Sequence, residues 1–295
     1  MTITSPFTQL FLPLAVAAVM FALGTTLTLS DLRRVMRKPR ALVLGLLAHA
    51  LLLPLLAFGV AAAFRLPGPM ALGLVLIAAC PANASVNLFT HLARGDTMLS
   101  VCLTAGASLT SVITIPLFMN AALHSFPSGH ASTSLAVLPA ALGLFLVSTL
   151  PVLAGMGFRH RRPQLARTLE ARMASLGLLA IVLVVLGAVW TMHSELWAAL
   201  AQVGVPAVVL NAVSVALAWA LAMLLGLPRA QCVAVGLECG LQNFALAAFI
   251  ALTLLQDATL LLPAIAYGLT MWLSAFAVLL LARRGGPGQL AAGAN

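Results

Sequence analysis

Long apolar runs, separated by short segments containing Pro, Gly and charged residues, repeat along the whole 295-residue chain. Most runs reach about 20 residues without alternating polar positions, which is the pattern of helices that cross a lipid bilayer. We predict an all-α polytopic membrane protein in which residues 1–295 form one domain. The nine predicted spans cover about residues 7–30, 41–64, 70–92, 97–120, 134–158, 173–193, 199–226, 229–255 and 259–282.

The composition excludes a soluble protein. Hydrophobic residues make up 62% of the chain and charged residues 7%, against roughly 45–50% and 25% in soluble domains. The net charge of +9 does not indicate nucleic-acid binding, because the cations form no stripe interleaved with aromatic residues. The four cysteines lie in apolar runs without metal-type spacing, so we expect buried thiols.

The positive residues gather in alternate loops. If the first span runs from outside to inside, 14 of the 15 Lys and Arg residues fall in inner loops, and Arg65 alone lies outside. Positive residues stay on the cytoplasmic side during membrane insertion. We therefore predict a multi-pass protein of the inner (plasma) membrane, with its N-terminus outside and its C-terminus in the cytoplasm.

Two of the predicted spans are interrupted. Pro81 removes a backbone donor within span 70–92, and Gly240 follows Glu238 within span 229–255. These spans hold equivalent places in two halves of opposite orientation, with span 134–158 left unpaired. Paired interruptions in inverted halves indicate the central binding site of a secondary transporter.

Glu238 is the one acidic residue of the six in the chain that lies deep inside a predicted span. A carboxylate at that depth costs several kcal/mol unless it is paired or water-lined. Because the spans contain no cation to pair with it, we expect its partner to be an ion that binds and leaves. Gln242 and Asn243 follow closely, and the carbonyls of a broken helix can coordinate sodium.

The break in span 70–92 predicts a seat for an anion. Asn83 is placed to cap the half-helix that follows. Free amides at about Ala84, Ser85 and Val86 would then direct a positive dipole end toward the membrane centre. Three nearby residues add side-chain oxygens: Asn87, Ser100 and Thr104.

Several sequence strings resemble the bile acid:sodium symporter family, in order and over nearly the whole chain. They are Leu29-Ser30-Asp31-Leu32 with Arg37-Lys38-Pro39, Gly73-Leu-Val-Leu-Ile-Ala-Ala-Cys80-Pro81, Asn87-Leu-Phe-Thr90-His-Leu-Ala-Arg94-Gly95-Asp96 with Leu99-Ser100, and Glu238-Cys-Gly-Leu-Gln242-Asn243. The resemblance is specific because the two motifs of the interrupted spans occur together.

The resemblance implies an inverted-repeat secondary transporter fold with two crossing discontinuous helices, lacking the first of the family's ten helices. Spans 7–30, 134–158 and 173–193 would form a panel domain, and the other six a core domain. The implied function is transport of a bile acid-like or other carboxylate, coupled to sodium by alternating access. It implies no enzymatic activity, no cofactor other than sodium as coupling ion, and no obligate protein partner.

The resemblance also assigns site residues by position. One sodium site would use Asn87, Ser100, Thr104 and Glu238. The other would use Glu238, Gln242 and the carbonyls of Cys239 and Leu241. Substrate would face Ala84, Ser85 and Asn243.

Three positions depart from the family pattern. Val86 replaces a typical serine ligand of the first sodium site, and His49 replaces the glutamine of the second. Ser274, with Leu273, replaces a His-Asn pair that faces substrate in some relatives. Imidazole offers one nitrogen acceptor in place of an amide oxygen. We expect at most one sodium ion per cycle, possible proton coupling and a marked dependence on pH.

Two alternatives remain open. An efflux carrier related to arsenite or auxin carriers would share this architecture, and Cys80 or Cys239 would then be candidate reactive residues. A membrane phosphatase is suggested by residues 125–132, which read Ser-Phe-Pro-Ser-Gly-His-Ala-Ser. That chemistry also needs an upstream Lys/Arg-Pro arm and a later nucleophile arm, which the sequence lacks, so a polar outer loop is favoured.

Overall fold

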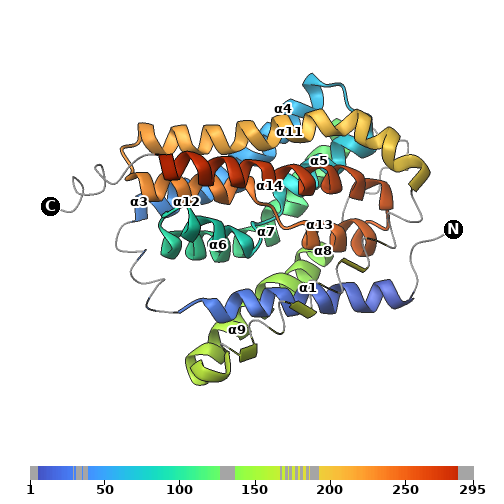
Figure 1. Cartoon of the computed structure of the whole chain (residues 1–295). Coiled ribbons are helices and arrows are strands. Elements are labelled where there is room, and N and C mark those ends of the chain that lie inside the picture. The colour runs from blue at the N-terminus through green and yellow to red at the C-terminus, as the bar shows by residue number, and fades with distance from the viewer. Residues whose placement is uncertain are drawn as a thin grey trace.

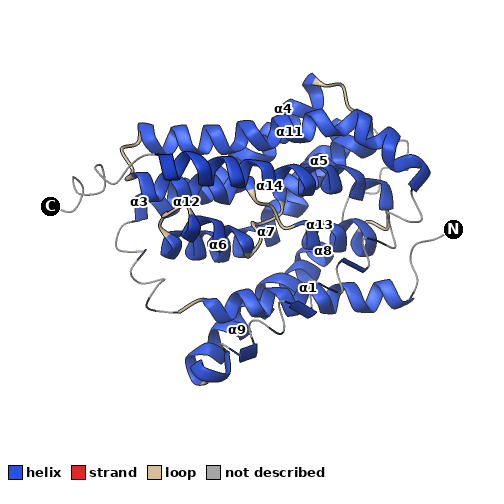
Figure 2. Ribbon diagram, viewed as in Figure 1, coloured by secondary structure: helices blue, strands red, loops and turns tan. Residues whose placement is uncertain are grey.

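The computed structural model describes residues 6–28, 39–126, 137–166 and 193–284, with scattered positions between these ranges. The described residues form helices joined by short loops, and none of them forms a strand (Figure 2). The all-helical prediction is therefore confirmed. The predicted span 173–193 lies largely outside the described residues, so the total of nine spans stays a prediction.

The helices follow one another in the order predicted from the apolar runs. They are α1 (Pro6–Thr26), α3 (Pro39–Leu47), η1 (Ala48–Leu52), α4 (Leu53–Ala63), α5 (Gly68–Ala79), α6 (Ser85–Leu92), α7 (Thr97–Ser125), α8 (Val137–Leu144), η2 (Phe145–Thr149), α9 (Leu150–Arg161), α11 (His193–Leu224), α12 (Arg229–Gly240), α13 (Phe244–Phe249), η3 (Ile250–Leu254), η4 (Ala258–Leu260) and α14 (Leu261–Arg284). The segments η1, η2 and η3 are single π-helical turns within longer helices.

Five helical stretches are long and apolar enough to cross a membrane. They are Pro39–Ala63, Thr97–Ser125, Leu138–Arg161, Leu200–Leu224 and Ala258–Ala282. Shorter apolar helices cover Leu10–Thr26, Gly68–Ala79 and Phe244–Leu254. The protein is thus a multi-pass membrane protein.

Both predicted interruptions are present. Helix α5 ends at Ala79, and α6 begins at Ser85, because Pro81 cannot donate to the helical ladder. Helix α12 ends at Gly240, and α13 begins at Phe244. The last turns of α5 and α12 are buried on all sides, as expected for apolar helices at the centre of a bundle.

The helices pack in two groups. Helix α1 packs along α9 and η2, and in Figure 1 this pair lies apart from the layer of α11, α12 and α14. The groups meet where α7 contacts α8 and η2, and where α13 contacts α1. Close packing of α1 and α9 depends on Gly24 and Gly155, since a Cβ atom at either would collide with a carbonyl of the other helix.

Candidate functional site at the crossing of two broken helices

The two helix breaks lie against each other. Ala82 and Gln242 form an isolated antiparallel bridge. The Asn83 amide donates to the Leu241 carbonyl at 3.1 Å, and the Asn243 amide donates to the Pro81 carbonyl at 2.8 Å. Each unwound segment thereby satisfies backbone groups of the other, which is how irregular backbone is tolerated at membrane depth. The two predicted interruptions therefore meet in the fold.

An asparagine caps each half-helix that leaves the crossing. The Asn83 side-chain oxygen accepts a hydrogen bond from the Ser85 amide at 2.9 Å, and that of Asn243 accepts from the Leu246 amide at 3.0 Å. The Asn83 side chain thus accepts from the first amide of α6, as predicted, although the residue directly before the helix is Ala84. The sequence interpretation missed the cap at Asn243, although its position after the second break offered the same signal.

The prediction of free amides at Ala84, Ser85 and Val86 is wrong in part. The Ser85 amide donates to the Asn83 side chain, and the Val86 amide donates to the Asn83 carbonyl at 3.2 Å. The cap that begins the helix occupies the same donors that were expected to hold an anion. Ala84 is exposed and Ser85 half-buried, so they remain accessible at this helix end.

Glu238 lies fully buried beside α7. The Thr104 hydroxyl lies 3.1 Å from Oε2 of Glu238 and makes the one hydrogen bond that described residues offer its carboxylate. Within the described chain, Oε1 has no partner. The Thr104 hydroxyl also lies 3.0 Å from the Ser100 carbonyl, so its single proton serves one acceptor at a time.

The structure brings together the four residues of the first predicted sodium site. Ser100 donates to the side-chain oxygen of Asn87 at 2.9 Å and lies one helical turn from Thr104, which contacts Glu238. Thr90, which the sequence interpretation missed, is fully buried and donates to the Ser100 hydroxyl at 3.3 Å. Thr90 follows Asn87 by three residues, so the two side chains share a face of a helix, and this spacing could have identified Thr90 from the sequence.

The second predicted group lies at the end of α12, after Glu238. The Gln242 amide nitrogen donates to the Cys239 carbonyl at 3.2 Å, and its oxygen has no partner among described residues. His49 Nε2 lies 3.0 Å from the Cys80 carbonyl and must donate to it, which leaves Nδ1 as an acceptor when the ring is neutral. Nδ1 likewise has no described partner.

Most backbone carbonyls of this second group are already engaged. The Leu241 carbonyl accepts from the Asn83 amide, and the Cys239 carbonyl accepts from Gln242 and from Ser214 at 3.2 Å. Asn211 and Tyr267 donate to the Gly240 carbonyl at 2.8 and 3.1 Å. The sequence interpretation did not include these three polar residues of α11 and α14, which satisfy the end of α12.

The two remaining predicted substrate residues differ in accessibility. Asn243 is 2% exposed, and its amide nitrogen lies 4.0 Å from the Met20 sulfur on α1. Ser274 is half-buried on α14 and donates to the Met271 carbonyl at 2.8 Å. It lies beside Gly240, where an added Cβ would be 3.6 Å from its hydroxyl.

Three buried acceptors without described partners therefore gather around the crossing: Glu238 Oε1, Gln242 Oε1 and His49 Nδ1. Buried polar atoms are nearly always satisfied, and an acceptor without a donor favours a bound cation. Groups of three or more His, Cys, Asp or Glu that would suit a transition metal do not occur among the described residues. The two oxygen acceptors, Glu238 Oε1 and Gln242 Oε1, suit a hard monovalent cation.

The structure adds little support for the two alternative functions, the efflux carrier and the membrane phosphatase. Cys80 and Cys239 do flank the breaks, but both are buried free thiols. The phosphatase-like string falls mostly in 127–136, outside the described residues.

Comparison with known proteins agrees with this geometry. A sequence model of the Sodium Bile acid symporter family matches residues 13–200. The chain is 28% identical over 243 residues to the uncharacterized sodium-dependent transporter YocS of Bacillus subtilis, covering 82% of this chain and 73% of that protein. It is 27% identical over 228 residues to the probable chloroplastic sodium/metabolite cotransporter BASS2 of Oryza sativa, covering 77% and 53%. It is 28% identical over 240 residues to the ileal sodium/bile acid cotransporter of Cricetulus griseus, covering 79% and 66%. These relatives are transporters and not enzymes, and the matches span about half to three quarters of their lengths.

Proposed function

The chain belongs to the sodium bile acid symporter family, and on that premise we propose that it carries a small organic anion across the membrane, driven by sodium bound at Glu238. The observation that carries this proposal is the buried Glu238 carboxylate, with one oxygen lacking a described partner, at the crossing of two broken helices. A buried charge in this position is costly alone and favourable with a cation.

The first group of ligands fits sodium best. Asn87, Ser100, Thr104 and Glu238 supply hard oxygen atoms on α6, α7 and α12, and each is linked to the next by close contact. Val86 contributes no hydroxyl here. The buried Thr90 hydroxyl lies one turn further along α6 and helps to position Ser100.

Apart from the Gln242 side-chain oxygen, which has no described partner, the second group offers few free oxygen ligands. Its carbonyls accept hydrogen bonds from Asn83, Gln242 and Ser214, and His49 offers a nitrogen where an amide oxygen would suit sodium better. We propose that the protein moves at most one sodium ion per transport cycle.

The substrate would bind at the start of α6. Ala84 and Ser85 are accessible there, and the positive end of the helix dipole favours a carboxylate. The relatives are named for bile acids and metabolites, which suits a carboxylate substrate in this chain. Asn243 and Ser274 complete the proposed substrate site from α13 and α14.

The transport cycle would move the two helix groups relative to each other. We propose that α1, the run of α8, η2 and α9, and span 173–193 form the panel domain, and that the remaining helices form the core domain. Helix α1 begins at one end of the bundle and α14 ends at the other (Figure 1), which supports an odd number of spans. With the positive residues in alternate loops, we propose nine spans with the N-terminus outside and the C-terminus inside.

The test is flux in proteoliposomes under an imposed sodium gradient. A panel of radiolabelled monocarboxylates, including a bile acid, is offered with inward sodium, and with potassium as the matched control. We expect accumulation of at least one carboxylate with sodium and none with potassium. If substrate accumulates equally with sodium and potassium, or if export exceeds uptake under every gradient, the protein is better described as an efflux carrier.

A further inference from the structure

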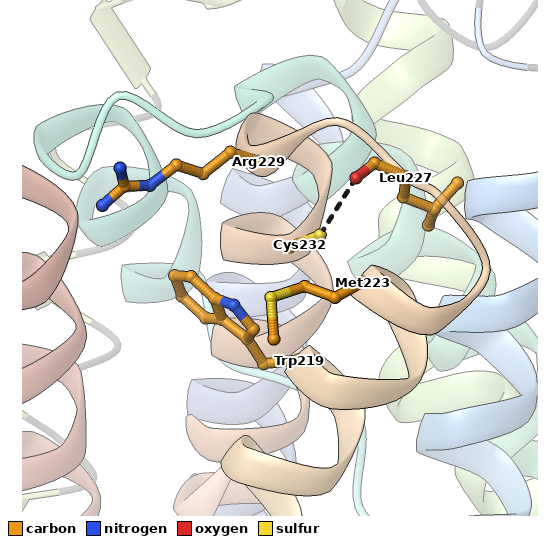
Figure 3. Close-up of a pocket in the computed structure, with 5 residues that line it drawn as sticks. All are labelled: Trp219, Met223, Leu227, Arg229 and Cys232. Carbon is orange, nitrogen blue, oxygen red and sulfur yellow. Dashed lines mark hydrogen bonds between the residues drawn. The ribbon is translucent and has the colours of Figure 1, made fainter. Parts of the chain in front are cut away.

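A pocket opens where α11 ends and α12 begins. It encloses about 430 Å³ and is lined by Trp219, Met223, Leu227, Arg229 and Cys232 (Figure 3). Four of these side chains present apolar or sulfur surface, and the guanidinium of Arg229 lies along one edge. Cys232 points to the Leu227 carbonyl, with its sulfur 3.4 Å away, so the thiol lines the wall and is not a free ligand.

The pocket lies at the level where two candidate membrane spans end. The candidate spans Leu200–Leu224 and Ala258–Ala282 both end beside it. Met223, Leu224 and Leu225 are 56%, 82% and 63% exposed, which is typical of side chains that face lipid. A pocket that is both apolar and cationic at this level faces acyl chains on one side and headgroups on the other.

Arg229 is held so that it can bind an anion. Its Nη2 donates to the carbonyls of Leu281 and Ala282 at 3.0 and 3.4 Å, at the end of α14. Among the described residues, none accepts a hydrogen bond from Nε or Nη1 of Arg229. A guanidinium held in this way offers a planar fork to phosphate oxygens. Arg283 and Arg284 follow Ala282 directly in sequence, and none of the described residues that line the pocket is acidic.

We propose that this pocket binds an anionic phospholipid, with the phosphodiester on Arg229 and an acyl chain along Trp219 and Met223. Apolar walls favour a lipid over free phosphate, and a tryptophan at the interface suits the boundary between chain and headgroup. Arg229 and Glu238 are nine residues apart on α12, about 13 Å along a helix. The lipid site is therefore separate from the proposed ion site, and would hold the ends of α11, α12 and α14 together.

Trp219 itself reports occupancy. Trp190, Trp197 and Trp272 are replaced by Phe, which leaves Trp219 as the single tryptophan. The protein is placed in phosphatidylcholine vesicles that contain a minor fraction of either brominated phosphatidylglycerol or brominated phosphatidylcholine. We expect quenching by the anionic lipid to correspond to a local enrichment of about fivefold, as estimated for one cationic residue near anionic lipid. Equal quenching by the two lipids overturns the proposal.

Matched variants assign the effect to the arginine. Arg229→Gln should bring quenching by phosphatidylglycerol down to the phosphatidylcholine level, whereas Arg229→Lys keeps the charge and should keep a preference. Arg161→Gln removes an exposed arginine at the end of α9 and should change nothing. Because the comparison of lipids needs no substitution at Arg229, misfolding of a variant leaves the test intact. Loss of the preference on adding millimolar inorganic phosphate would indicate a simple anion site and overturn the lipid assignment.

Discussion

Replacing Glu238 by Gln removes one negative charge from the helix crossing and keeps the size of the side chain. The Thr104 hydroxyl, 3.1 Å from Oε2, can donate equally well to an amide oxygen at that position. The variant no longer buries an ionised group without a cation. We therefore expect its melting temperature in sodium-free buffer to equal or exceed that of the wild type.

We expect Glu238→Gln to bind sodium much more weakly than the wild type. At a contact distance of about 2.4 Å and an effective dielectric constant of about 20, a carboxylate and a monovalent cation attract by about 7 kcal/mol. Part of this offsets the cost of burying the carboxylate. We expect a net loss of about 3 kcal/mol, or about 100-fold in sodium affinity.

The assay compares thermal unfolding in sodium chloride and potassium chloride at equal ionic strength, together with sodium-driven uptake. The wild type should be stabilised by sodium, because a ligand bound to the folded state raises its stability. Glu238→Gln should lose both this stabilisation and substrate accumulation. Asp257→Asn is the matched control, since Asp257 caps Thr259 outside the crossing and Asn keeps an acceptor. A well-folded Glu238→Gln protein that still responds to sodium and accumulates substrate would refute the coupling role.

Three further predictions concern other parts of the site and fold. Ala84→Asp should weaken transport of an anionic substrate at least about tenfold more than Ala84→Asn, because its negative charge repels the substrate and cancels the attraction of the positive end of α6. Equal effects of the two variants in competition uptake would point to steric damage. His49→Gln restores an amide oxygen at the second ion site, so paired sodium and substrate fluxes should show a higher sodium-to-substrate ratio than the wild type; an unchanged ratio, or two sodium ions in the wild type, contradicts the reasoning. Gly155→Ala should lower the melting temperature through a collision with the Phe21 carbonyl, costing about 1–3 kcal/mol. Gly157→Ala, where a Cβ meets open space on the same helix, should not lower it, and similar losses in both would exclude tight α1–α9 packing as the cause.

The sequence was sufficient to predict that the described residues form apolar helices and where two of these helices break. Lipid imposes its requirement on one segment at a time: about 20 apolar residues, with every backbone group satisfied inside the helix. Pro81 and the polar string after Glu238 violate that requirement, so both breaks could be located without knowing what surrounds them. The functional role expected for Glu238 follows from the same requirement, because an ionised side chain deep in a membrane span needs a partner.

The contacts across the site were decided by tertiary structure. Asn83 donates to the Gln242 carbonyl across 159 residues, and Thr104 contacts Glu238 across 134. Hydropathy carries no information on such pairings, because lipid is as apolar as the helices and lateral packing depends on shape and hydrogen bonds. For the same reason neither the engagement of the Ser85 and Val86 amides by Asn83 nor the position of Thr90 was predicted. An apolar run specifies that a helix lies in the membrane, whereas close contacts such as that of Gly155 with α1 specify which neighbour it has.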